Sequence, residues 1–162
     1  MVCLEPSDVS MFHDEYFSLL DHDSVSAVAG ETYGIFEFLN TYTLGESLET
    51  TVNGQKLTFH GHCNQKALNE AHHVSAVLEQ CGFRVDTVDS GCCGMAGSFG
   101  YEREHFELSK AIGSILVNQI THSLGETIVA PGVSCRTQLQ DSSIDSPIEH
   151  PIETLADAVT DS

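Results

Sequence analysis

The chain has 162 residues, of which 41% are hydrophobic. This length and composition are typical of one folded domain with its own hydrophobic core, and no stretch has the composition of an interdomain linker. Asp and Glu number 24 against six Lys and Arg, which gives a formal net charge of −18. Because such a charge repels phosphate groups, it argues against nucleic acids and anionic lipids as partners.

The acidic residues are spread along the whole chain, whereas lysine occurs only at positions 56, 66 and 110. A surface of this kind suits a cytoplasm of high salt concentration, where screening suppresses self-repulsion. We therefore expect a halophilic source, and the other interpretation is an acidic protein from a mesophile. The first residues contain neither a basic region nor a long apolar run, so we expect no secretory signal, no membrane span and a cytoplasmic location.

The N-terminal part is predicted to be mostly helical. A short strand at residues 2–4 precedes a helix at residues 9–20, and a second helix is expected at residues 24–39. In the second helix apolar residues recur at intervals of three and four, which indicates an amphipathic helix. Gly30 and Gly34 weaken this prediction.

From residue 56 onward, strands and helices alternate. Strands are predicted at residues 56–60, 83–88 and 127–130, and helices at residues 65–80 and 101–120, with a short helix near Cys135 and a last one opened by Pro151. Gly82 is expected to end the helix at residues 65–80 in the left-handed conformation. This alternation predicts an α/β fold in which a parallel sheet is flanked by helices.

Six cysteines in a chain without an export signal argue against disulfides, because cytosolic thiols are kept reduced. Four of them each follow a predicted strand: Cys63, Cys92, Cys93 and Cys135. Since parallel strands end at the same edge of a sheet, three loops would bring these four thiols together. Cys3, within a strand, and Cys81, at a helix end, are expected to be small core residues.

A faint internal repeat links the two ends of the chain. Residues 2–8 resemble residues 128–135, since each segment contains an apolar strand, a proline and then a serine. Asp8 takes the place of Cys135. The similarity suggests a duplicated ancestor, of which this chain keeps one whole copy and the tail of another.

Convergent thiols at this edge of the sheet suit two kinds of metal site. An iron–sulfur cluster takes thiolates on several irons, whereas structural zinc takes four ligands around one ion. We favour the cluster, because neighbouring side chains such as Cys92 and Cys93 tend to diverge. A three-cysteine zinc site completed by Asp8 or His62 stays open. A thiol–disulfide function is disfavoured, because a vicinal disulfide is strained and no Cys-x-x-Cys is present.

The loop after Cys93 is rich in glycine. Gly94 and Gly97 would let backbone N–H groups approach a bound cluster, and Ser98 follows in the same loop. Together with His62, these three residues are the candidate cofactor contacts. The alternative is a tight loop that needs glycine only for its turns.

Several polar side chains near Cys63 and Cys135 could tune such a site. His60 and His62 are candidate hydrogen-bond donors to the ligands, or structural residues. Lys66 and Arg136 could offset the negative charge of a thiolate-bound cluster, or be plain surface residues.

Three segments together resemble the cysteine-rich CCG domain. They read His-Cys-Asn-Gln-Lys-Ala from residue 62, Gly-Cys-Cys-Gly-Met-Ala-Gly-Ser-Phe-Gly-Tyr-Glu from residue 91, and Ala-Pro-Gly-Val-Ser-Cys-Arg from residue 130. The family includes the cysteine-rich component of heterodisulfide reductase and the iron–sulfur components of glycolate and glycerol-3-phosphate dehydrogenases. The chain most resembles the C-terminal region of FAD-linked oxidases of the D-lactate or D-2-hydroxyglutarate dehydrogenase type, and haloarchaea are the expected source.

The resemblance implies a role in electron transfer. It implies an iron–sulfur cluster, [4Fe–4S] in the first instance, on Cys63, Cys92, Cys93 and Cys135. FAD would lie on a partner dehydrogenase domain or subunit, and a ferredoxin-like iron–sulfur domain would be a second partner. Electrons would pass from the flavin of a 2-hydroxyacid dehydrogenase to an acceptor, so no residue of this chain is expected to be catalytic. The alternative is a zinc-stabilised scaffold or docking domain without redox activity.

The resemblance also bears on domain organisation and location. Residues 1–162 would form a single CCG-type domain, in which residues 1–50 are the end of a preceding repeat with connecting helices and residues 51–162 are one complete repeat. The module would lie in the cytoplasm, or at the inner face of the membrane through its partners.

The chain departs from the family pattern at two positions. The pattern ends in Cys-x-x-Cys, but Gly132 replaces the first cysteine of that pair, and Asn64 stands where a histidine is common. Four motif cysteines remain, one fewer than the five of the non-cubane clusters of heterodisulfide reductase. The sequence therefore leaves the type of cluster open.

Overall fold

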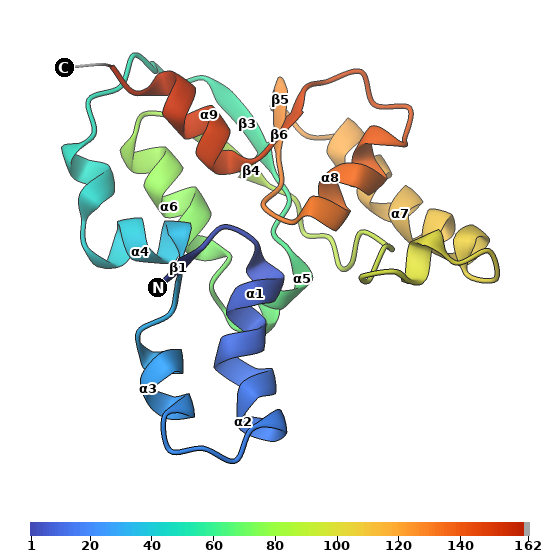
Figure 1. Cartoon of the computed structure of the whole chain (residues 1–162). Helices are drawn as coiled ribbons and strands as arrows, with labels where there is room; N and C mark the ends of the chain where they lie inside the picture. Colours follow the sequence, from blue (N-terminus) through green and yellow to red (C-terminus); the bar gives the residue numbers. More distant parts are fainter. Residues whose placement is uncertain (161–162) are drawn as a thin grey trace.

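A parallel four-stranded sheet lies between two layers of helices in the computed structural model, which describes residues 1–160 (Figure 1). The strands are β3 (Lys56–Phe59), β4 (Arg84–Thr87), β5 (Thr127–Val129) and β6 (Ile148–Glu149). Their order across the sheet is β4-β3-β5-β6, and all neighbours run parallel. The predicted α/β fold is confirmed, and β6 is a strand that the sequence did not predict.

Helices cover both faces of this sheet. Figure 1 shows α6 (His72–Gln80) and α9 (Pro151–Ala158) on one side, and α7 (Phe106–Thr121) and α8 (Val133–Gln140) on the other. The longest helix, α7, has 16 residues. Within residues 1–160 no helix has both the length and the apolar character that crossing a lipid bilayer requires.

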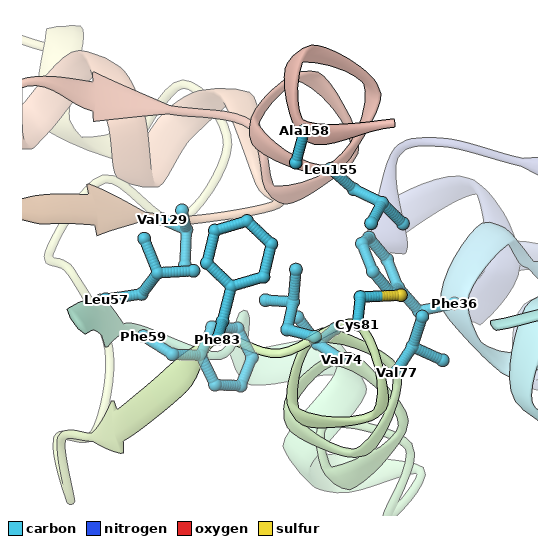
Figure 2. Packing of buried hydrophobic residues seen from close by; sticks show 11 residues of the cluster. Phe36, Leu57, Phe59, Val74, Val77, Cys81, Phe83, Val129, Leu155 and Ala158 are labelled. Carbon is cyan, nitrogen blue, oxygen red and sulfur yellow. The ribbon is translucent and has the colours of Figure 1, made fainter. Parts of the chain in front are cut away.

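Two hydrophobic clusters, one on each face of the sheet, form the core. Side chains alternate along a strand, so Val129 packs in the cluster with α6 and α9, whereas its neighbour Ile128 packs in the cluster with α7 and α8. Figure 2 shows the first cluster, in which Phe59 and Phe83 lie between the sheet and α6. Three helices, α4 (Ile35–Thr41), α6 and α9, contribute to that cluster.

Residues 1–34 contain a separate two-stranded sheet and short helical segments. β1 (Val2–Cys3) pairs in parallel with β2 (Tyr33–Gly34). Between them lie α1 (Pro6–Ser10), a π-helical segment (Met11–Glu15), α2 (Tyr16–Leu19) and α3 (Val25–Gly30). The first three run on without a break, as the predicted helix at residues 9–20 requires. The single helix expected at residues 24–39 is wrong, because β2 interrupts it where the chain pairs with β1.

The predicted helix at residues 65–80 is also divided. It consists of α5 (Cys63–Ala67) and α6, and the chain turns between them at Asn69, whose φ of 59° lies in the left-handed region that asparagine tolerates. Gly82 has a φ of 94° directly after this helix, as expected. Pro151 opens α9, also as expected.

Candidate metal centre

The structure brings the four motif cysteines together at the carboxyl edge of the sheet. Cys63 is the first residue of α5 and follows β3, Cys92 and Cys93 lie in the loop after β4, and Cys135 is the third residue of α8, after β5. β4, β3 and β5 are adjacent strands, so their loops meet. Cys63, Cys92 and Cys93 line one cavity of about 500 Å³, and Cys135 lies buried against Cys93.

The thiols of Cys93 and Cys135 share a hydrogen bond. The Cys135 thiol donates to the sulfur of Cys93 and lowers the pKa of Cys93 to about 6, whereas the same bond and burial raise the pKa of Cys135. Burial raises the pKa of Cys63 as well, and the negative charge of a Cys92 thiolate adds to that effect. The two buried thiols therefore shift each other's pKa in opposite directions.

A metal group would have to draw these side chains toward itself. Within residues 1–160 no three or more His, Cys, Asp or Glu side chains are arranged so that they could hold a metal ion as they stand. The donor set nevertheless fits an iron–sulfur cluster, since thiolates are its usual ligands and the cavity lies among the cysteines.

The glycine-rich loop contributes backbone groups to the site. The N–H of Gly94 donates to Cys92 Sγ at 3.3 Å. Gly94 has a φ of 97°, and a Cβ atom there would lie 2.3 Å from a backbone carbonyl of α7, so no other residue fits. Gly97 lines the cavity, with a φ of 67°. Ser98 is exposed and outside the cavity lining, where its hydroxyl bonds to Glu102.

His60 and His62 take different positions. His62 lines the cavity, and its Nδ1 accepts a hydrogen bond from the N–H of Asn64 at 3.2 Å. Burial lowers the pKa of His62. His60 is fully buried behind the site; its Nδ1 lies 2.7 Å from Ser90 Oγ, and its Nε2 has no partner within residues 1–160. Burial lowers the pKa of His60 to about 3, so both rings are neutral at pH 7.

The two cationic candidates also differ. Lys66 donates from Nζ to the backbone carbonyl of Ser90, directly before the cysteine loop. Burial lowers the pKa of Lys66, and negative charge on Cys135, Asp89, Cys63 and Cys92 opposes this effect. Arg136 instead donates to the carbonyls of Ala130 and Pro131, at 2.8 and 2.7 Å, and so holds the chain that leads from β5 to α8.

The N-terminal segment contributes residues that sequence reasoning missed. Glu5 and Ser7 line the cavity, and Glu5 Oε2 accepts a hydrogen bond from the N–H of Val133 at 2.9 Å. The internal repeat was the available signal, because it equates residues 2–8 with residues 128–135. Asp8, which the repeat equates with Cys135, is exposed and is not part of the lining.

A known protein family matches the part of the chain that contains the four cysteines. The family model described as a cysteine-rich domain, CCG, matches residues 57–140. This range is more than half of the chain and contains all four cysteines of the cavity region.

The curated relatives are longer proteins, and this chain matches a part of each. D-2-hydroxyglutarate dehydrogenase of Escherichia coli K12 is 31% identical over 98% of this chain, and that of Pantoea ananatis is 25% identical over the same share. The chain spans 15% of the length of either protein. One component of the anaerobic glycerol-3-phosphate dehydrogenase of E. coli K12 is 31% identical over 64% of this chain, which spans 26% of that component. With its three motif segments inside the matched range, the chain belongs to the cysteine-rich CCG domain family.

Proposed function

We propose that this chain is the iron–sulfur electron-transfer module of a FAD-linked 2-hydroxyacid dehydrogenase. The observation that carries the proposal is the convergence of four thiols, from three loops, beside one cavity of about 500 Å³. Two relatives with D-2-hydroxyglutarate dehydrogenase names support the class of substrate. The chain's own residues supply the ligands, and a flavin domain or subunit elsewhere would carry out the oxidation.

The ligands of the proposed cluster are Cys63, Cys92, Cys93 and Cys135. When bound, a [4Fe–4S] cluster would accept and release one electron at a time. The Gly94 N–H group donates to Cys92 Sγ, and the positive charge of Lys66 interacts favourably with negative charge on Cys135, Cys63 and Cys92. These groups stabilise thiolates in a chain whose overall charge is strongly negative, and so favour loading of the site.

The cavity also meets the surface, where a partner can approach. Tyr101 and Val133 line it and are 68% and 57% exposed. An exposed aromatic ring and an aliphatic side chain at the mouth of a redox site suit contact with another protein. We propose that this face meets the FAD-binding dehydrogenase domain or a ferredoxin-like iron–sulfur domain, in the cytoplasm, where thiols stay reduced.

The first test is metal analysis of protein prepared without oxygen. We expect iron and acid-labile sulfide, with an electron paramagnetic resonance signal that appears on reduction. Replacement Cys93→Ser should abolish this signal and most of the iron. Cys3→Ser is the matched control, because Cys3 lies outside the cavity lining, and it should keep both.

Two results would count against this proposal. Stoichiometric zinc, with no iron and no reducible signal, would favour the zinc-stabilised scaffold instead. Full iron content in Cys93→Ser would remove Cys93 from the set of ligands.

A further inference from the structure

The imidazole of His62 fills the space that a side chain at position 132 would need. Gly132 is the N-cap residue of α8 and has φ −76° and ψ 131°, backbone values that any amino acid adopts. A Cβ atom at this position would lie 2.3 Å from Cδ2 and 3.1 Å from Nε2 of His62. The histidine, and not the backbone, is therefore what requires glycine at position 132.

His62 is not free to turn away. Its side chain is 5% exposed, and it caps the N-terminus of α5. Nδ1 accepts from the N–H of Asn64 at 3.2 Å, while the backbone N–H of His62 donates to Gln65 Oε1 at 3.3 Å. A rotation that cleared position 132 would break the first of these bonds and leave a buried ring nitrogen without its partner.

The same contact determines which nitrogen carries the proton. Because Nδ1 accepts a hydrogen bond, the proton of the neutral ring lies on Nε2. This nitrogen is on the edge of the ring that faces position 132, and His62 is one of the residues that line the cavity of the cysteines. The side of the site where the family pattern has a cysteine thus holds an N–H donor in this chain.

We propose that His62 stands in for the missing cysteine of the Cys-x-x-Cys pair. It excludes a fifth thiolate at position 132 and supplies an N–H donor to the bound cluster in its place. The donor half of this inference rests on the proposed function. The exclusion limits the site to four thiolates and removes one negative charge from its ligand shell, which favours a cubane cluster over a five-thiolate cluster.

A stability cycle on metal-free protein tests the exclusion. Gly132→Cys should lower the thermal midpoint by about 3–10 °C, the usual effect of overpacking in a chain of this size. In a His62→Ala background the same substitution should cost less than half as much. Gly30→Cys is the control, because nothing lies within 4 Å of a Cβ atom there, and it should change the midpoint little. An equal cost of Gly132→Cys in both backgrounds, or no cost in either, would overturn the exclusion.

Anaerobic reconstitution tests the ligand count. In the His62→Ala, Gly132→Cys double variant the introduced cysteine should be protected from thiol labelling, and the resonance spectrum of the reduced protein should differ from that of the wild type. In Gly132→Cys alone the introduced cysteine should react. Protection in the single variant would show that His62 leaves room for a fifth thiolate.

The reduction potential tests the donor. Hydrogen bonds to a cluster stabilise its reduced form, so His62→Ala should lower the midpoint potential, and His62→Gln, which keeps an N–H group, should restore part of it. A potential unchanged in His62→Ala would overturn the donor role. A wild-type protein that loads only zinc would overturn the proposed electron transfer and the donor role together, while the stability cycle would still decide the exclusion.

Discussion

The fold keeps His60 uncharged over a wide range of pH. Its ring is fully buried and bonded to Ser90, and burial, with smaller effects of Lys66 and His62, lowers its pKa to about 3. In the unfolded chain the same histidine titrates near its ordinary pKa of 6.5. Between pH 6.5 and 3, therefore, the unfolded chain binds the proton and the folded chain does not. Stability falls as the pH falls through this window, and His60 has no such effect above it.

We expect His60 alone to remove about 2 kcal/mol from the free energy of unfolding between pH 7 and pH 5 in metal-free protein. His60→Asn keeps a polar partner for Ser90 but does not titrate, so its loss over this interval should be smaller by that amount. Urea unfolding at the two pH values measures the difference. Burial also lowers the pKa values of His62 and His150. The free energy of unfolding should therefore still fall with pH in His60→Asn, but less steeply than in the wild type. Parallel slopes in the wild type and the variant would show that His60 can take up a proton in the folded state.

At the scale of elements, the parts that deliver the cysteines could be predicted, because their signals are local. β5 lies in a short apolar run, β3 and β4 lie in segments that alternate apolar and polar residues, and glycine follows each strand within a few residues. A parallel sheet then requires their loops to meet. The break at β2 could not be predicted in this way. Its pairing partner, β1, lies 31 residues earlier in the chain, and the apolar spacing around it fits a helix equally well.

In the candidate site, too, contacts between distant residues could not be predicted from local sequence. Its four cysteines are evident from sequence, but the contacts that complete it join distant residues. Glu5 bonds to the chain 128 positions later, and the ring of His62 packs against Gly132 across two different strand-to-helix connections. Gly132 is recognisable as a departure from the family pattern, but only three-dimensional packing identifies the side chain that replaces it.

Helix α7 packs closely against the cysteine loop at Gly113. Gly113 lies within α7, and a Cβ atom there would lie 2.6 Å from Gln138 Nε2 and 3.1 Å from the carbonyl oxygen of Cys93. Alanine gains about 1 kcal/mol of helix propensity over glycine, whereas overpacking costs about 1–3 kcal/mol. Gln138 cannot yield freely, because it donates to the carbonyl of Ser109 at 3.0 Å. The cost should therefore exceed the gain.

We expect Gly113→Ala to lower the free energy of unfolding by about 1–2 kcal/mol in urea titrations. It should also reduce iron loading, since Cys93 must shift to accommodate the methyl group. Ser114→Ala, at the next and exposed position of the same helix, is the control and should change stability by less than about 0.5 kcal/mol. A Gly113→Ala protein as stable as the wild type would mean that α7 and the loop are less tightly packed than the structure indicates.

For the whole molecule, the acidic charge is not balanced by ion pairs. The two pairs formed within residues 1–160 both involve histidine, His13 with Glu70 at 3.4 Å and His105 with Glu102 at 2.9 Å. In the same part of the chain no lysine or arginine lies within salt-bridge distance of a carboxylate. The net charge of −18 therefore acts as self-repulsion, which the compact state must withstand.

Screening this repulsion should stabilise the protein. The Debye length falls from about 10 Å at 0.1 M salt to about 3 Å at 1 M, so the free energy of unfolding, measured with uncharged urea, should rise with KCl over this range. Asp21→Asn with Asp23→Asn removes two exposed charges and should stabilise the protein by about 0.2–1 kcal/mol at 0.1 M KCl, and by almost nothing at 1 M. If salt acted only by strengthening hydrophobic burial, the double variant would remain more stable than the wild type at 1 M KCl. Convergence of the two proteins at high salt would instead identify self-repulsion as the term that salt removes, which is the physical basis for expecting a halophilic source.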